Sequence, residues 1–316
     1  MDQTSRTLEG RRFGGYQVLG LVHRRMSVET YRARQVAVNR LVDLTVLPPD
    51  AARKPAAVLR FERALSVTGR LRHDNVAAAI DAGAVDGWRY FVTEHVEGTT
   101  LADALARGDT ISRPRALEIA HDVARAIAHL EEVGVVHRGV SPASIVLSDA
   151  GPAKLTEFVW AKSRTPEEAE TWFDADTEGA AYVSPDRIRG DKGLDARGDV
   201  YSLGCVLYRL VAGRSPFHGA NAAMMLDAHL NRRPRDPRTL LEDLPAGLVH
   251  VLDRCLRKSP ELRYAKAADL VTDLAALRAG SDPPTPDTAR LLWPSKNVRP
   301  SNFRTGKQRG SGPGAA

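Results

Sequence analysis

Chemically capable side chains are concentrated between positions 137 and 199 of this 316-residue chain. His137, Glu157 and Asp199 supply an imidazole and two carboxylates, which are groups that act as general acids and bases. Ser141 and Ser144 add hydroxyl oxygens, which a hard cation such as Mg²⁺ accepts as weak ligands. Acid–base and metal-assisted chemistry both use these residue types.

Thiol and redox chemistry are not indicated. The chain has two cysteines, Cys205 and Cys255, and neither lies in a C-x-x-C pair. Both fall in segments expected to be helical, where a cysteine is usually a small buried apolar residue. Two cysteines cannot form a disulfide framework, and the first ten residues hold no apolar run typical of a secretory signal. We therefore expect a cytoplasmic protein without a transmembrane segment.

The elements that must position these groups begin with strands. Predicted strands, which are rich in β-branched and aromatic residues, cover residues 16–22, 29–34, 35–44, 76–82 and 89–96. Asp86-Gly87 is the expected hairpin turn before the last of them. One helix is predicted within this region, over residues 51–71. The first part of the chain therefore predicts a small sheet with one helix.

The pattern of apolar residues in the rest of the sequence predicts helices. Ile119, Val123, Ile127 and Leu130 are spaced by 4, 4 and 3 residues, which places them on one face of a helix that Ser112 would cap. Further helices are predicted over residues 200–211, 222–230, 244–256 and 265–277. The overall expectation is an α+β fold of two lobes, with a flexible lead at 1–14, a domain at 15–280 divided near residue 97, and a disordered tail at 281–316.

The net charge of +6 comes mostly from that tail. Residues 281–316 hold six basic and two acidic residues, so they carry +4 and leave only +2 for the other 280. A nearly neutral body does not favour specific nucleic-acid binding. The tail is expected to be solvated, or to contact an acidic surface, with the cluster Leu291-Leu292-Trp293 either anchoring that contact or packing on the body.

Six segments, in order, resemble the motifs of bacterial serine/threonine (Hanks-type) protein kinases. They are V-T-E-H-V-E-G-T-T-L at 92–101, H-R-G-V-S-P-A-S-I-V-L at 137–147, K-L-T-E-F-V at 154–159, G-A-A-Y-V-S-P-D at 179–186, D-A-R-G-D-V-Y-S-L-G at 195–204 and S-P-E-L-R-Y at 259–264. The first is similar to the hinge between lobes, the second to the catalytic loop, and the third to the D-F-G segment. The resemblance runs from residue 16 to about 277 and implies a two-lobed kinase fold with a small antiparallel sheet lobe and a larger helical lobe.

The resemblance also implies which positions transfer phosphate, and this chain departs from the family at each. Kinases position ATP and two Mg²⁺ ions with a glycine-rich loop, a Lys–Glu pair, a base Asp, a metal-binding Asn and the Asp of D-F-G. The matching positions here hold, in that order, His23, Arg25 and Val28 in the loop, Asn39 and Ala64 for the pair, Gly139 for the base, Ser144 for the Asn, and Glu157 for the D-F-G Asp. Ser141 stands where the family has its catalytic-loop Lys. No catalytic position is therefore intact, and a metal site is not expected.

The positions that hold the fold are retained. By the same resemblance, they are His137, Arg138, Phe158, Asp186, Asp199 and Arg263. Asp186 and Arg263 are expected to form a buried ion pair, in which one charge without the other would be costly. Residues that hold the fold are thus present, whereas residues that do the chemistry are missing.

Three hypotheses about function follow. The first is a pseudokinase that acts on protein partners as a scaffold or allosteric regulator and requires no cofactor. The second is an unorthodox kinase in which Arg24 or Arg25 replaces the lysine. The third is a regulator that binds ATP, with or without Mg²⁺, but does not transfer phosphate. For the last two, the expected nucleotide pocket holds Val22, Arg24, Arg25, Ala37, Thr93, Glu94, Val96, Val146 and Glu157.

An acidic segment at 167–178 adds one hypothesis about conformation. It contains Glu167, Glu168, Glu170, Asp174, Asp176 and Glu178. In the family, the residue equivalent to Arg138 often pairs with a phosphorylated residue of this segment. Fixed carboxylates would take that part without phosphorylation, although a solvated acidic loop explains the composition equally well.

Overall fold

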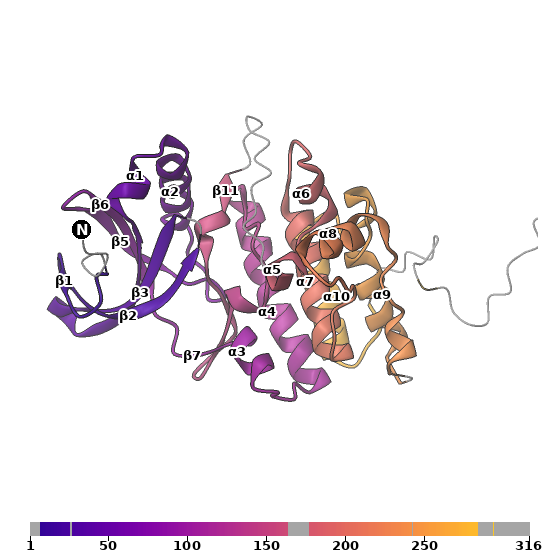
Figure 1. The fold of residues 1–316 in the computed structure, drawn as a ribbon. Helices are drawn as coiled ribbons and strands as arrows, with labels where there is room; N and C mark the ends of the chain where they lie inside the picture. The colour runs from indigo at the N-terminus through magenta and orange to yellow at the C-terminus, as the bar shows by residue number, and fades with distance from the viewer. Residues whose placement is uncertain (1–6, 26, 164–176, 242, 284–292, 294–316) are drawn as a thin grey trace, which may run out of the picture.

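A six-stranded antiparallel sheet forms the N-terminal lobe, with the strand order β1-β2-β3-β4-β6-β5. A computed structural model of the chain describes residues 7–25, 27–163, 177–241, 243–283 and 293. The strands are β1 Arg12–Phe13, β2 Tyr16–Arg25, β3 Val28–Gln35, β4 Arg40–Leu47, β5 Ala79–Val85 and β6 Trp88–Glu94. Figure 1 shows this lobe beside a larger helical lobe. The two-lobed α+β fold expected from the sequence is confirmed.

The third long strand begins later than predicted. Residues 36–39 do not belong to it: Val36–Val38 form a 3-10 turn, and Asn39 has a left-handed backbone with φ of 50°. Strand β4 instead pairs with β3 on one side and with β6 on the other, from Val42 opposite Glu94 to Leu47 opposite Arg89. The V-A-V-N run has strand-like residues, but it reverses the chain between β3 and β4.

The alternation of apolar and polar side chains along β4 explains the register in which this strand pairs with its neighbours. Val42, Leu44 and Val46 are fully buried in the core of the sheet lobe. Asp43 and Thr45 point to the opposite face, toward the other lobe. Because side chains of a strand alternate between faces, a shift by one residue would bury the aspartate in the apolar core.

Helix α2, Pro55–Thr68, packs on this lobe after the short helix α1, Pro49–Ala52. Ala57, Phe61 and Ala64 face the sheet and form a small apolar cluster with Val28, Leu47 and Phe91. The predicted helix over 51–71 is therefore two helices, because Pro55 begins a new helix at its first turn.

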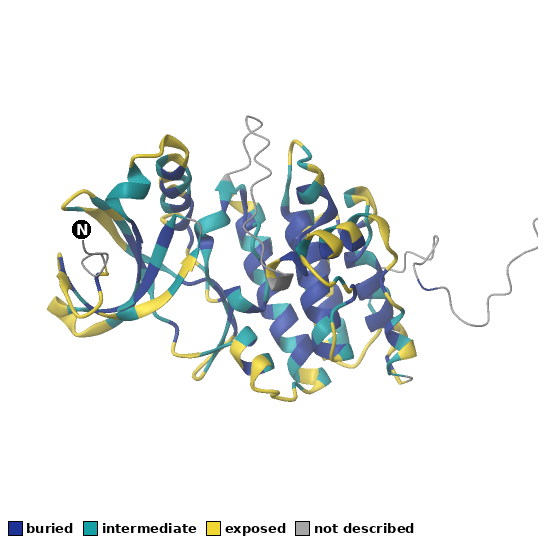
Figure 2. Cartoon of the chain, viewed as in Figure 1, coloured by how far each residue is buried: buried dark blue, intermediate teal, exposed yellow. Residues whose placement is uncertain are grey.

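The helical lobe is built around two long helices, α4 Arg113–Glu132 and α7 Ala196–Ala212. The Ser112 side chain caps α4 as predicted, by accepting a hydrogen bond from the backbone N–H of Arg115. Asp195 caps α7 in the same way. Figure 2 shows α7 buried along nearly its whole length, which is the pattern of a central core helix.

Shorter elements surround these two helices. They are α3 Leu101–Ala106, α5 Thr177–Ala180, α6 Pro185–Arg189, α8 Ala222–Asn231, α9 Ala246–Cys255 and α10 Ala267–Arg278. Small strands next to the sheet lobe are β7 Gly98–Thr100, β8 Val135–Val136, β9 Ile145–Ser148, β10 Lys154–Leu155 and β11 Lys162–Ser163. None of the helices in the described part of the chain combines the length and apolar character needed to span a bilayer.

The folded body extends beyond the predicted boundaries at both ends. Leu8 and Phe13 are buried, and Phe13 packs edge-on against Trp88 and Tyr90. Residues 8–13 therefore belong to the sheet lobe and are not a flexible lead. In the predicted tail, Trp293 is 4% exposed and lies in the core cluster of the helical lobe. Leu8, Phe13 and Trp293 lie in polar stretches of the sequence, but each side chain is buried in the folded body. The burial of these apolar side chains holds the segments against the body.

Candidate functional site

A cleft of about 120 Å³ lies between the two lobes. This volume is below the roughly 300–1,000 Å³ of typical small-molecule sites. Its lining residues are Val22, His23, Thr30, Arg32, Asp43, Thr45, Ala77, Phe91, Thr93, His95, Val96, Gly98, Thr100, Ala143, Val146, Thr156, Glu157, Phe158 and Val159. Val22, Thr93, Val96, Val146 and Glu157 line the cleft as predicted.

Two predicted positions, Ala37 and Asn39, lie outside the cleft. The Asn39 side chain accepts a hydrogen bond from Arg34 at the exposed end of the sheet, 3.1 Å away. The segment that matches the family's V-A-I-K is therefore residues 42–45, in which Asp43 and Thr45 face the cleft. The lysine position is Thr45. The alternation of apolar residues along 42–47 and the need to pair with the hinge strand were the signals that pointed to this register.

Thr45, at the family's lysine position, carries no charge that could neutralise phosphate. It is 5% exposed, and its hydroxyl lies 3.1 Å from that of Thr30 on the neighbouring strand. Ala64, at the position of the partner glutamate, is 1% exposed and packs in the apolar cluster with Phe61 and Phe91. In place of the family's ion pair, Thr45 therefore contacts the hydroxyl of Thr30, and Ala64 packs against apolar side chains.

The position of the family's alanine over the adenine ring is occupied by Asp43, which is held by two basic groups. Arg32 Nε donates to Asp43 Oδ1 at 3.0 Å, and Arg32 Nη1 lies 2.9 Å from His95 Nε2. His95 Nδ1 is 3.5 Å from the same Asp43 oxygen. Arg32 thus hydrogen-bonds both Asp43 and His95, and the three side chains lie together in the slot where the resemblance places adenine.

A second polar group lies where metal-bound phosphates would be. Glu157 Oε1 is 2.7 Å from His23 Nε2. Glu157 Oε2 accepts no hydrogen bond from any residue that the structure describes, and it lies 3.9 Å from Arg25 Nε. His23 and Arg25 stand at two of the three positions where the family has glycines, so the loop that would cradle phosphates instead contacts the carboxylate directly.

Arg24 and Glu94 do not face the nucleotide slot. Arg24 has a side chain that is 61% exposed, and it bonds Glu29 on the neighbouring strand. Glu94 pairs with Lys154 Nζ at 2.5 Å. Arg24 therefore does not replace the missing lysine in this conformation.

The catalytic loop keeps its support. The Asp199 carboxylate accepts hydrogen bonds from the backbone N–H of His137 at 2.7 Å and of Arg138 at 2.8 Å. Burial raises the pKa of Asp199 to about 6, although these two N–H groups act in the opposite direction. His137 packs edge-on against Phe158, and burial lowers the pKa of His137 to about 4. The predicted scaffold roles of these residues agree with this geometry.

At the base position, an aromatic ring occupies the space of the missing side chain. A Cβ atom on Gly139 would lie 3.1 Å from Trp160 Cδ1. The guanidinium of Arg187 lies 5.3 Å from the centre of the Trp160 ring and donates to the carbonyl of Arg138. Burial, followed by the charge of Arg138, lowers the pKa of Arg187 to about 9. Trp160 and Arg187 were not predicted from the sequence, because no motif marks them.

The hydroxyl of Ser144 also faces away from the cleft. It donates toward the carbonyls of Gly139 and Ser141, both at 3.0 Å, and accepts from the backbone N–H of Ser141 at 3.0 Å. Ser144 is fully buried. This hydroxyl closes the loop on itself and is not presented to a cation.

The residues present do not fit a catalytic Mg²⁺ site. Such a site needs several oxygen ligands in tight octahedral geometry. Here the only carboxylate at the expected place, Glu157, lies against His23 and Arg25, and Ser144 is turned inward. Within the described residues, no group of three or more His, Cys, Asp or Glu side chains is placed to hold a metal ion.

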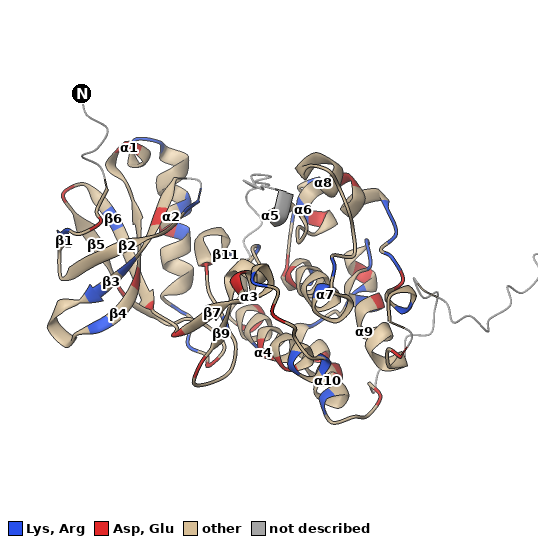
Figure 3. Ribbon diagram, turned by 60° about the horizontal axis from the view of Figure 1, so that its bottom comes forward, with Lys and Arg blue, Asp and Glu red and all other residues tan. Residues whose placement is uncertain are grey.

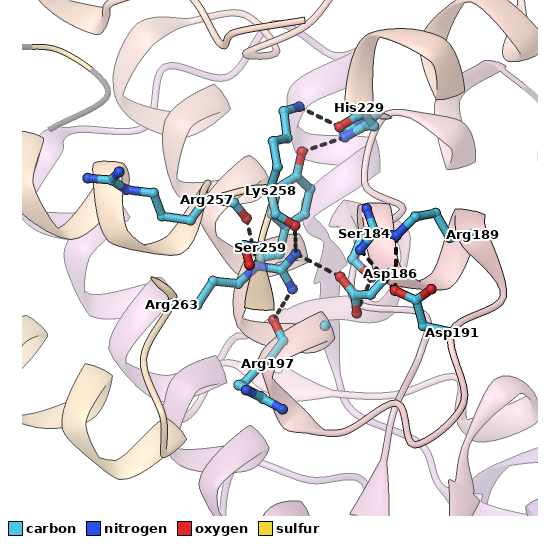
Figure 4. A network of polar contacts seen from close by, with 12 residues as sticks. Ser184, Asp186, Arg189, Asp191, Arg197, His229, Arg257, Lys258, Ser259 and Arg263 are labelled. Carbon is cyan, nitrogen blue, oxygen red and sulfur yellow. Dashed lines mark hydrogen bonds and ion pairs between the residues drawn. The ribbon is translucent and has the colours of Figure 1, made fainter. Parts of the chain in front are cut away.

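The fold-holding ion pair is present as predicted, as Figure 4 shows. Arg263 Nη2 lies 2.7 Å from Asp186 Oδ1, and both side chains are at most 5% exposed. Arg263 Nε and Nη1 donate to the backbone carbonyls of Arg257 and Arg197, and Nη2 also donates to the carbonyl of Lys258. Every charge in this buried group therefore has a partner.

Two further sequence predictions concern charge. The acidic segment that would pair with Arg138 falls mainly on residues 164–176, which lie outside the described residues. In the described part of the body, Figure 3 shows basic and acidic positions interspersed along both lobes. This distribution agrees with the low net charge of the body.

Comparison with known proteins agrees with the fold and the motifs. The family described as protein kinase domain matches residues 29–273. The chain is 34% identical over 262 residues to the serine/threonine-protein kinase PknB of Mycobacterium leprae, which covers 82% of this chain and 42% of that protein. It is 31% identical over 278 residues to the probable serine/threonine-protein kinase SCO3848 of Streptomyces coelicolor, covering 86% of this chain and 41% of that protein.

A solved structure shows the same fold. The kinase domain of Mycobacterium tuberculosis PknI superimposes with a TM-score of 0.65 at 24% identity, covering 85% of this chain and 98% of that domain. The chain spans about two fifths of the length of the curated relatives given above. With the family match covering most of its length, the chain belongs to the protein kinase family.

Proposed function

We propose that this protein is a pseudokinase: a kinase-fold domain that acts by binding protein partners and does not transfer phosphate. The observation that carries this proposal is the contact of His23 and Arg25 with Glu157, in the space that metal-bound phosphates require. The carboxylate at the position that would hold Mg²⁺ instead contacts side chains of the protein itself.

The base position supports the same proposal. Phosphoryl transfer to a hydroxyl needs a group that orients the hydroxyl and accepts its proton. Gly139 offers none, and Trp160 lies over the place where a side chain would extend. Removing a single group that stabilises transition-state charge costs roughly 2.7–4 kcal/mol in activation free energy. Losing Lys, Glu, Asn and the base together leaves no set of groups that could act.

A thermal shift measurement tests the proposal directly. A ligand that binds only the native state must raise the melting temperature, by an amount that grows with ligand concentration. We expect no shift with millimolar ATP, whether alone or with Mg²⁺ or Mn²⁺. The positive control is an active kinase domain in the same buffer. A metal-dependent shift together with phosphate transfer to a protein substrate would overturn the proposal.

A nucleotide-binding regulator is the second candidate. Thr93, Val96 and Val146 still line the cleft, and they are acceptable neighbours for an adenine ring. For adenine to enter, Asp43 must separate from Arg32 and His95, which bridge the slot. A shift with ATP that does not depend on metal, without phosphate transfer, is the result that favours this candidate.

The mode of action on a partner requires a second experiment. A scaffold recruits a partner without changing its intrinsic rate, whereas an allosteric regulator changes that rate. Co-purification of partners with the full chain, followed by an assay of partner activity with and without the chain, distinguishes the two. A third candidate function is an unorthodox kinase. If the protein is one, the experiment with ATP and metal should detect phosphate transfer to a protein substrate.

A further inference from the structure

Trp293 lies twenty residues beyond the last residue that matches the kinase family, yet it is buried in the helical lobe. Its indole Nε1 donates to the carbonyl of Pro234 at 2.9 Å. Its own carbonyl accepts from Arg238 Nη2 at 3.0 Å. The indole is 6.4 Å from the ring of Tyr208, centre to centre. Both polar groups of this residue that face the lobe are therefore satisfied.

The groups that contact Trp293 are themselves held in place. Tyr208, on α7, is fully buried and donates its hydroxyl to the carbonyl of Arg235 at 2.9 Å. Arg238 makes a two-pronged contact with Asp236, in which Nε and Nη2 each bond a carboxylate oxygen. The contact with Asp236 orients the Arg238 guanidinium, and Nη2 also donates to the Trp293 carbonyl. The surface formed by Tyr208, Pro234 and Arg238 is called the tryptophan socket below.

The start of the tail also packs on the helical lobe. Pro283 packs so closely on Gly247, near the start of α9, that a Cβ atom at Gly247 would overlap its ring. Nine residues separate Pro283 from Trp293, and an extended chain of ten steps reaches up to about 35 Å. Pro283 and Trp293 of one chain both contact the helical lobe, so the tail reaches the socket of its own molecule.

We propose that the tryptophan socket is a peptide-docking site selective for an indole, and that this chain fills it in cis with Trp293. The indole N–H bond to Pro234 provides the selectivity over phenylalanine, which has no donor. One such hydrogen bond corresponds to a difference of about 2-fold to 10-fold in affinity. The Arg238 contact to a backbone carbonyl provides recognition of the peptide main chain. Docking would fix the start of the basic residues that follow Trp293.

The test uses the full chain with Trp293→Ala, which empties the socket, and a fluorescent peptide of residues 288–298. We expect saturable binding of the peptide to this variant in fluorescence anisotropy, and at least 10-fold weaker binding to the wild-type chain, whose socket is filled. The same peptide with alanine in place of tryptophan should not bind. Adding Arg238→Ala to the variant should weaken binding of the intact peptide.

Equal binding of the peptide to both chains, or binding to neither, would overturn the proposal. If Trp293→Ala does not fold, a comparison of the wild-type chain with Trp293→Phe replaces the binding test. The indole N–H resonance that disappears in Trp293→Phe is assigned to Trp293 by nuclear magnetic resonance. In the wild-type chain, this indole proton should exchange slowly with water. Fast exchange contradicts docking. A wild-type chain that is a dimer in light scattering, and becomes a monomer with Trp293→Ala, contradicts docking in cis.

Discussion

The buried ion pair of the helical lobe and the polar contacts of the cleft both involve ionisable side chains, but they differ in burial and in residue type. Asp186 and Arg263 are at most 5% exposed and keep the family's residue types or close relatives. In the cleft, His23 and Glu157 are 22% and 16% exposed, and neither is the family's residue. The comparison separates a buried ion pair that holds the fold from partly exposed contacts between residues that differ from those of the family.

Electrostatics explains why one set was retained and the other was replaced. A buried charge that loses its partner costs several kcal/mol, so neither Asp186 nor Arg263 can change alone. Charges that act on a ligand carry no such constraint when the ligand is absent. With Thr45 at the lysine position and Ala64 at the glutamate position, Glu157 contacts His23 and Arg25 of the loop.

The largest effect is expected for Arg263→Met. This change leaves Asp186 buried without its cation, and breaking one side of a buried pair costs about 3–5 kcal/mol in unfolding free energy. Urea denaturation followed by circular dichroism measures the loss. The matched control is the double variant Asp186→Asn with Arg263→Met, which removes both charges and should recover part of it. A single variant as stable as the wild type would contradict the comparison.

The next effect concerns pH and His229 in the helical lobe. Burial, followed by the charge of Lys258, lowers the pKa of His229 to about 3 from an ordinary value of 6.5. Since the folded pKa lies below the unfolded one, the stability from the neutral form is present above pH 6.5 and is lost as pH falls toward the folded pKa. The unfolding free energy should therefore drop by about 3 kcal/mol between pH 6.5 and pH 4 through this group alone.

The control for this effect is His229→Asn. The amide oxygen can accept the hydrogen bond that His229 Nδ1 takes from Tyr201, 2.9 Å away, but the amide does not titrate. The variant should show a smaller loss of stability over the same pH range, measured by urea denaturation at each pH. Asp199 contributes with the opposite sign, since burial raises its pKa, but it does so equally in both chains. Identical pH profiles would contradict the prediction.

A smaller effect is expected at the base position. Gly139→Asp introduces a Cβ atom 3.1 Å from Trp160, and overpacking of this kind costs about 1–3 kcal/mol. Combining it with Thr45→Lys should still give no phosphate transfer, because Ala64 and Ser144 remain. Thermal melting and a radiolabelled ATP assay measure the two outcomes. Gly139→Ala should show most of the stability loss, and transfer by the double variant would overturn the pseudokinase proposal.

The smallest effect is expected for His23→Ala in the cleft. Its pair with Glu157 is partly exposed, and pairs of this kind contribute about 0–1 kcal/mol. The melting temperature should change by no more than a few degrees, in contrast to Arg263→Met. Arg24→Ala, which removes an exposed pair with Glu29, is the control. A loss as large as that of Arg263→Met would mean that the cleft contacts also hold the fold.

Most elements of the fold could be predicted from the sequence, because periodic apolar residues and capping residues act locally. Helix α4 and its cap at Ser112 are confirmed. The motifs around His137, Glu157 and Asp199 also located the catalytic loop and its support. The strand carrying Thr45 was misplaced, because V-A-V-N at 36–39 and V-D-L-T at 42–45 have similar local patterns. The buried alternation along 42–47 and the pairing of β4 with the hinge strand β6 distinguish them.

The sequence by itself determined the kinase family resemblance and the absence of the family's catalytic residues at Gly139 and Ala64, since these are properties of residue identity in order. Only the tertiary structure decided what fills the space they left. Trp160 over Gly139, the Asp43 contacts across the adenine slot, and Trp293 in its socket each join residues far apart in the chain. Such contacts depend on packing in three dimensions, which no local pattern of residues specifies.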